Sequence, residues 1–129
     1  MKNFSEATVI KPTLKLDISV LLVGIGDCDC TLTVNGKILC EGQLNGSVEF
    51  KTQVGLIDPI NITIAIHNRQ HPQAVMISGI YIDNKEIMPL YLNHSTPPTN
   101  YLDFTGVWAL TIPNFYPWYH AITGQGWVV

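Results

Sequence analysis

Strict alternation between apolar and polar positions is the feature that most constrains this chain. Residues 60–66 read Ile-Asn-Ile-Thr-Ile-Ala-Ile. A period of two puts all four isoleucines on one face of a strand, whereas a helix would distribute them around its circumference. The same period recurs over residues 14–22. We therefore expect strands with one buried face, and we place strand 60–66 centrally, because a long apolar strand at a sheet edge invites aggregation.

Turn signals divide the rest of the chain into further short strands. Asn35-Gly36 predicts a two-residue hairpin between strands 30–34 and 37–41. Gly24 and Gly26 are expected to end the strand over residues 14–22, which precedes this hairpin. Further strands are predicted over 47–52, 74–82, 85–87 and 105–112, with a tight turn at 83–84 and a loop at 67–73. The sequence therefore predicts an all-β fold, an antiparallel β-sandwich or jelly roll of about eight to nine strands, in one domain spanning 1–129.

Charge and hydropathy exclude two classes of partner. Only 13% of the residues are charged, the net charge is −3 and there is one arginine. Nucleic-acid binding needs clustered Lys and Arg, so we expect no nucleic-acid partner. The most apolar run, residues 18–25, is far shorter than the ~20 residues of a membrane helix, so no membrane partner is expected. The first six residues lack the apolar core of a secretory signal, which predicts synthesis in the cytoplasm.

Three cysteines are an odd number and do not suit a disulfide framework. With a regular two-residue turn at Asn35-Gly36, Cys40 lies opposite Thr31, and Cys30 lies opposite Glu41. Cys30 and Cys40 are then expected on opposite faces of the sheet, where only a β-bulge would let them bridge. We therefore expect the cysteines to remain reduced.

Few residues offer catalytic chemistry. Asp27 and Asp29 lie two apart and, with a histidine, could form a small hydrolase site, but such pairs are typical of turns that bond their own backbone. The chain has no nucleophile elbow, no phosphate-binding glycine loop and no zinc-protease helix motif. We expect no enzyme activity and no catalytic residue.

Metal ligands are similarly sparse. Cys28, Cys30, His67 and His71 could supply four zinc ligands, but their spacing does not match a zinc knuckle. Asp27, Asp29 and Asp58 fall in predicted loops and could offer oxygen ligands to calcium, without the dense cluster of an EF-hand. The sequence predicts no metal site and no cofactor.

Aromatic residues gather toward the end of the chain. Trp108 lies within a predicted strand and is expected in the core. Beyond it, residues 113–129 form an aromatic tail whose rings could anchor a protein interface or stack on sugar rings. The alternative is that the rings plug one end of the sandwich. The candidate interface or glycan-binding residues are Phe115, Tyr116, Trp118, Tyr119 and Trp127.

Two stretches carry a resemblance to known families. Residues 60–68 followed by 75–87 resemble the strand–loop–strand of xylan-binding carbohydrate-binding β-sandwich modules. Residues 101–118, with Gly106-Val107-Trp108 leading to a Pro, Tyr and Trp cluster, are similar to the closing motif of small tailed-phage proteins built on that sandwich. The family loop usually carries acidic calcium ligands, whereas here the loop reads His-Asn-Arg-Gln-His over 67–71.

Together, the low charge, the aromatic tail and the resemblance predict a non-enzymatic structural or accessory protein of a phage virion. It would decorate the capsid or join the tail or fibre, docking onto other virion subunits and onto copies of itself through apolar and aromatic surfaces. The expected location is the virion, after synthesis in the host cytoplasm. The alternative is a carbohydrate-binding module in which Tyr116, Trp118 and Trp127 stack on a glycan.

Overall fold

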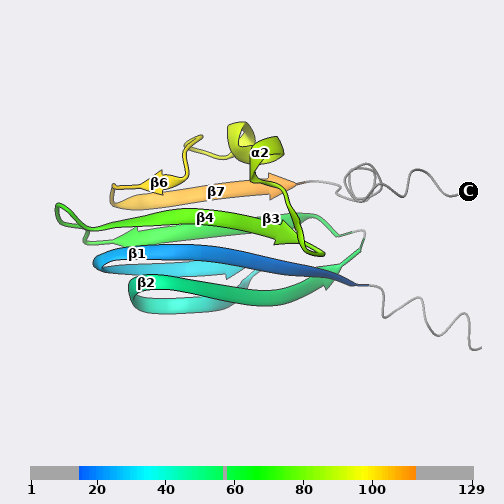
Figure 1. The fold of residues 1–129 in the computed structure, drawn as a ribbon, viewed down its shortest axis with the longest axis horizontal. Coiled ribbons are helices and arrows are strands. Elements are labelled where there is room, and N and C mark those ends of the chain that lie inside the picture. The colour runs from blue at the N-terminus through cyan, green and yellow to red at the C-terminus, as the bar shows by residue number, and fades with distance from the viewer. Residues whose placement is uncertain (1–14, 57, 113–129) are drawn as a thin grey trace, which may run out of the picture.

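The computed structural model describes residues 15–56 and 58–112. The described chain runs through β1 (Lys15–Val34), β2 (Lys37–Gly55), β3 (Ile60–His67), β4 (Ala74–Ile82) and β5 (Lys85–Glu86). The short helical segments α2 (Met88–Tyr91) and η2 (Leu92–His94), then β6 (Tyr101–Leu102) and β7 (Gly106–Ile112), complete it. Every strand pair is antiparallel, which confirms the predicted all-β class (Figure 1).

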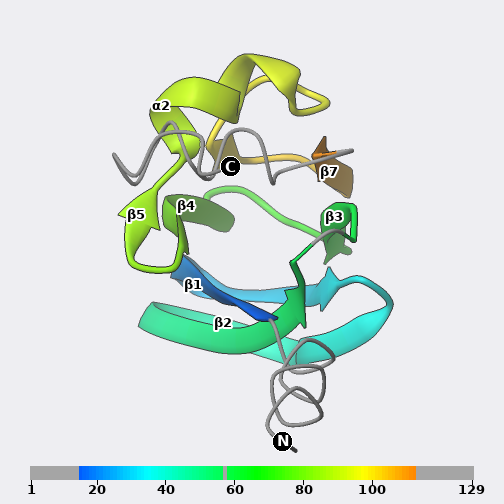
Figure 2. The same ribbon diagram turned by 90° about the vertical axis from the view of Figure 1, so that its right-hand side faces the viewer.

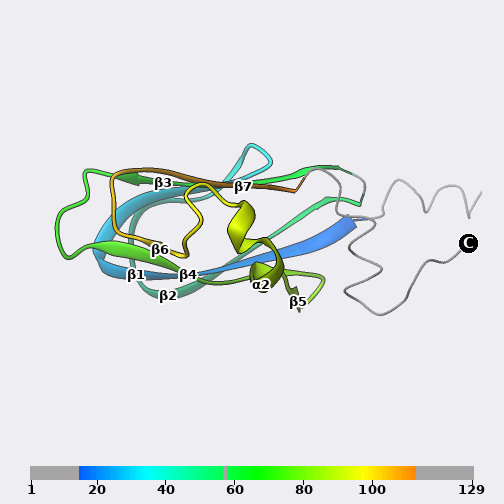
Figure 3. The same cartoon turned by 90° about the horizontal axis from the view of Figure 1, so that it is seen from above.

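One curled sheet forms both layers of the sandwich. Its strand order is β5-β4-β1-β3-β7, with β2 along the other side of β1 and β6 beside β4. The first half of β1 pairs with β4, and the second half pairs with β3. Seen along the strands, β4 and β5 lie on one side and β3 and β7 on the other, with β1 and β2 curling beneath both (Figure 2). The helical segment α2 lies at the opposite edge of the two layers (Figures 2 and 3).

Bulges let β1 and β2 serve both layers. Glycines were expected to end the first strand, but β1 continues through Gly24 and Gly26, and β2 continues through Gly46. The register of β1 against β2 shifts between Gly24 and Cys28, where Gly26 and Asp27 have φ of 74° and 54°. A bulge bends a strand without ending it. Segments that were expected to be separate strands are therefore joined in β1 and β2, and the described residues form seven strands, whereas eight to nine were expected from the whole chain.

The inward rows of the strands build the core as their period of two predicts. The four isoleucines of β3 are at most 1% exposed, and β3 lies between β1 and β7 as expected. Trp108 of β7 is fully buried opposite Ile64, which confirms its place in the core. Burying each such side chain contributes about 1.5–3 kcal/mol to folding, so the interleaved isoleucines are a main source of stability.

A second bulge corrects the expected placement of the cysteines. Asn35 and Gly36 form the predicted turn, with φ of 49° and 81°. The register then shifts past Leu39, so that Cys40 lies opposite Leu32 and Gly42 opposite Cys30. Cys30 and Cys40 therefore share the inward face, and their thiols are close enough for each to affect the pKa of the other. The prediction of opposite faces was wrong because the hairpin pattern alone does not reveal the extra residue.

None of the helical segments in the described ranges is long and apolar enough to cross a membrane. The segment after β5 contains the single turns α2 and η2. Pro89 fits the start of α2, where a missing backbone N–H removes no intrahelical bond.

Candidate functional site

A shallow groove runs along the outer face of the layer formed by β4, the first half of β1 and the second half of β2. This layer faces the viewer in Figure 1. Ser19, Leu21 and Val23 of β1 form its floor, because the inward row of the same strand is occupied by the core. Their side chains are short and half-buried. We call this feature the β1 groove.

Longer side chains from the neighbouring strands form the walls of the β1 groove. Glu49, Lys51 and Gln53 rise from β2 on one side, and Tyr81 and Asn84 line the other side. Three adjoining hollows of about 270, 250 and 410 Å³ follow one another along the floor. At ~3.3 Å per residue, the floor from residue 17 to residue 23 extends over roughly 20 Å. The site is therefore elongated.

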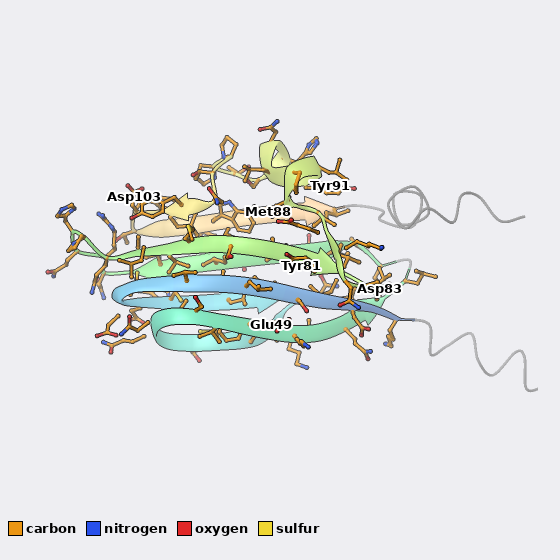
Figure 4. All side chains as sticks on the ribbon, in the orientation of Figure 1. Glu49, Tyr81, Asp83, Met88, Tyr91 and Asp103 are labelled. Carbon is orange, nitrogen blue, oxygen red and sulfur yellow. The ribbon has the colours of Figure 1, made fainter. Side chains whose placement is uncertain are left out.

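Tyr81 gives the groove an aromatic surface. A Cβ added at Gly79 would meet the Cε1 atom of Tyr81 at 2.8 Å, so the ring lies back along β4 over the glycine. Tyr81 pairs with Ser19 in the register of β4 against β1 and is half-buried. Because Gly79 has no side chain, the tyrosine ring is held against the sheet. Figure 4 shows Tyr81 and Glu49 on strands that flank β1.

Hydrogen bonds fix the end of the groove at Asp17. The amide of Gln53 donates to Asp17 Oδ1 at 2.7 Å. The backbone N–H of Asp17 donates to Asp83 Oδ1 at 2.7 Å, and the N–H of Asp83 donates to the carbonyl of Asp17 at 2.8 Å. Asp83 and Asn84 have φ of 49° and 66°, which confirms the predicted tight turn. These bonds hold the turn and its polar side chains beside the floor.

The β1 groove suits a ligand with both hydroxyl groups and apolar C–H faces. Carboxylate and amide groups of Asp17, Glu49 and Gln53 can accept or donate hydrogen bonds. An aromatic face such as that of Tyr81 can pack against a ring of C–H groups. Lys51 is a cation beside Glu49, with 3.9 Å between Nζ and Oε2. The groove thus offers hydrogen-bonding groups and an aromatic face along one elongated floor.

The predicted loop at 67–73 lies at one end of the sandwich and is held by its own hydrogen bonds. Arg69 Nε donates to the carbonyl of Gln73 at 2.6 Å, and the Arg69 backbone N–H donates to Thr105 Oγ1 at 2.9 Å. The side chain of Gln73 donates to the carbonyl of Gly26 at 2.9 Å. These bonds tie the loop to β1 and to the segment before β7. They also engage the side chain of Arg69, the arginine of the loop.

The structure does not assemble the zinc or calcium candidates. Cys28 and Cys30 are buried on the inward face, whereas His67 is exposed on the outer face, within 3.0 Å of Thr31 Oγ1. His71 lies in the loop beyond. The described residues contain no group of three His, Cys, Asp or Glu side chains able to hold a metal ion. Loop 67–73 supplies no carboxylate. Its side chains therefore do not suit calcium, which prefers carboxylate and carbonyl oxygen ligands.

The candidate hydrolase pair is also divided. Asp27 and Asp29 were expected in a loop or turn, but both lie within β1. Asp27 is exposed at the bulge of this strand, with a φ of 54°. Asp29 is half-buried in the ladder, opposite His67 of β3. Neither aspartate lines the β1 groove.

The five aromatic residues predicted to form an interface or a glycan site lie outside the described residues. These are Phe115, Tyr116, Trp118, Tyr119 and Trp127. The sequence reasoning missed the residues of the β1 groove. A usable signal was present, since alternation places Asp17, Ser19, Leu21 and Val23 on the outward face, and Tyr81 follows Gly79 at the same-face spacing of two.

Two solved structures share the fold. One is the selenomethionine form of vCBM60, from work on a circular permutation that links two families of calcium-dependent carbohydrate-binding modules. It has a TM-score of 0.51 and 15% identity, covering 77% of this chain and 91% of that chain. The other, vCBM60 in complex with galactobiose, has a TM-score of 0.51 and 16% identity, covering 76% and 98%. No family model and no curated protein matches the sequence. The likeness shows a fold of the carbohydrate-binding-module type.

Proposed function

We propose that this protein is a non-catalytic carbohydrate-binding module that binds an extended glycan along the β1 groove. The observation that carries the proposal is the half-buried ring of Tyr81, held over Gly79 beside an elongated floor with polar walls. Sugar rings present C–H faces to aromatic groups and hydroxyls to polar ones, and this groove offers both. The shared fold with vCBM60, which was solved with galactobiose, supports a glycan as the ligand class.

The proposed binding is independent of calcium. The similar modules are described as calcium-dependent, but no group of three metal-ligating side chains gathers among the residues placed by the structure. The proposed contacts in the β1 groove are hydrogen bonds and ring stacking, which need no bound ion. Chelation with EDTA should therefore leave glycan affinity unchanged.

The test is titration calorimetry against a panel of neutral linear polysaccharides and their oligosaccharides, galactans included. Tyr81→Ala should weaken binding about tenfold, because a stacked aromatic contributes about 1–1.5 kcal/mol. Tyr101→Ala is the matched control, since Tyr101 is 42% exposed on β6 and does not line the groove. Equal losses in the two variants, or wild-type silence across the panel, would contradict the proposal.

The phage virion role expected from the sequence stays a prediction. Its proposed docking residues belong to the tail 113–129, which lies outside the described residues, and the two similar folds are carbohydrate-binding modules. Mass spectrometry of purified particles from the source would test it through the copy number per particle. Absence of the chain from every particle would remove that role.

A further inference from the structure

The outer edge of β2 is a long unpaired strand edge. β2 pairs with β1 over almost all of its 19 residues, and no other strand in the described ranges pairs with it. Such an edge presents free backbone N–H and C=O groups that can pair with another strand. Val48 and Phe50 belong to the inward row, opposite Leu22 and Val20. Even so, Val48 is 36% exposed and Phe50 is only half-buried, so the edge also leaves apolar surface open.

The side chains around Phe50 form a charge-complementary inverted repeat. The sequence reads Val48-Glu49-Phe50-Lys51-Thr52, with an acid before the aromatic residue and a base after it. We propose that a second copy of this chain pairs with the β2 edge, antiparallel, about a two-fold axis at Phe50. Glu49 of each copy then lies opposite Lys51 of the other, and Val48 lies opposite Thr52. A symmetric dimer requires such a self-complementary surface.

This pairing covers the exposed apolar side chains at the open edge. Phe50 meets its own copy at the axis, and Val48 is covered by the neighbouring strand. Opposite charges directly across an antiparallel pair stabilise it, and like charges destabilise it. The β2 strands of the two copies then join their layers into one continuous sheet, and the outer face of each copy's layer points the same way. If the β1 groove binds glycans as proposed above, the dimer presents two grooves side by side, about three strand spacings of ~4.8 Å apart.

A second inverted repeat lies near the start of β2, where Lys37 and Glu41 flank Leu39. Leu39 is the extra residue of the bulge, since the register passes from Ile38 directly to Cys40. A bulge interrupts the regular ladder and protects an edge from pairing. The stretch from Gly46 to Gly55 keeps an unbroken register with β1, so the axis at Phe50 is the one that supports regular pairing.

Sedimentation velocity on the full chain, over a series of concentrations, tests the proposal. We expect a monomer–dimer equilibrium in the wild type. Glu49→Lys creates two like-charge pairs in the dimer and should raise its dissociation constant about tenfold, as should Lys51→Glu. The double variant Glu49→Lys/Lys51→Glu restores both opposite-charge pairs and should return the dissociation constant close to the wild-type value. Because both side chains are exposed, circular dichroism should show an unchanged fold.

Lys37→Glu is the matched control for charge change elsewhere on the same edge. It should leave dimerisation unchanged if the axis lies at Phe50. A wild-type monomer up to about 1 mM would overturn the proposal. So would failure of the double variant to recover, or a larger effect of Lys37→Glu than of Glu49→Lys. None of these outcomes depends on glycan binding, so the dimer and the glycan site can fail separately.

Discussion

The backbones of β1 and β2 approach each other closely at Gly24, where the register between the two strands begins to shift. A Cβ built on Gly24 would lie 2.1 Å from the carbonyl oxygen of Leu44 and 2.8 Å from the backbone nitrogen of Asn45. These atoms belong to the backbone and cannot rotate away as a side-chain end could. Gly24→Ala should therefore push the two strands apart at the bend.

The structure gives the size of the effect. Ordinary contact begins near 3.4 Å, so the Leu44 carbonyl would have to move by about 1 Å, which is severe overpacking. We expect a loss of about 3 kcal/mol in the free energy of unfolding, at the upper end of the usual range for such changes. For 129 residues the unfolding entropy is about 0.27 kcal/mol/K, so the melting temperature should fall by about 11 °C.

Gly46→Ala is the matched control, because Gly46 lies directly opposite Gly24 in the register. Its added Cβ would meet nothing within 4 Å, and only its φ of 80° is unfavourable to alanine. That conformation costs about 1–2 kcal/mol, partly offset by the stiffer unfolded chain, so the melting temperature should fall by about 4 °C. Calorimetry and urea titration measure both variants. Equal losses would refute the close approach at the bend.

Two further predictions concern the core thiols and the first hairpin. Burial is the main cause that raises the pKa of Cys30 from 9.0 to about 12. The thiol therefore loses its proton at a lower pH in the unfolded chain than in the folded one, so the free energy of unfolding should fall as the pH rises from about 9 to 12. Cys30→Ala should make this fall shallower, as measured by urea titrations at successive pH values. An unchanged dependence of the free energy of unfolding on pH would contradict the assignment. Asn35→Ala removes the acceptor for the Asn61 N–H at 2.7 Å and the donor to Pro59 at 3.0 Å. It should cost about 1–3 kcal/mol. Asn68→Ala is the matched control, because Asn68 has nearly the same φ, 48° against 49° at Asn35; an equal loss there would assign the effect to backbone conformation and not to the two bonds.

Local patterns in the sequence were enough to predict much of the fold. The isoleucines at alternate positions of 60–66 determine which face of β3 is buried, and Asn35-Gly36 determines the hairpin turn. Both signals act over a few residues, because strand alternation and positive φ are local properties. The position of Trp108 in the core was predicted from its place within a strand. The β1 groove was only partly visible, since alternation shows that Ser19 and Leu21 face outward but not what lies beside them.

The sequence by itself determined the strands, the main turns, the buried faces and the low charge of this protein. Tertiary structure decided that Gly24 and Gly26 bend β1 instead of ending it, that Leu39 shifts Cys40 onto the face of Cys30, and that Tyr81 and Glu49 flank one floor. The physical reason is that a bulge and a groove depend on which strand pairs with which, and in what register. Those pairings join residues far apart in the chain, and period and propensity do not encode them.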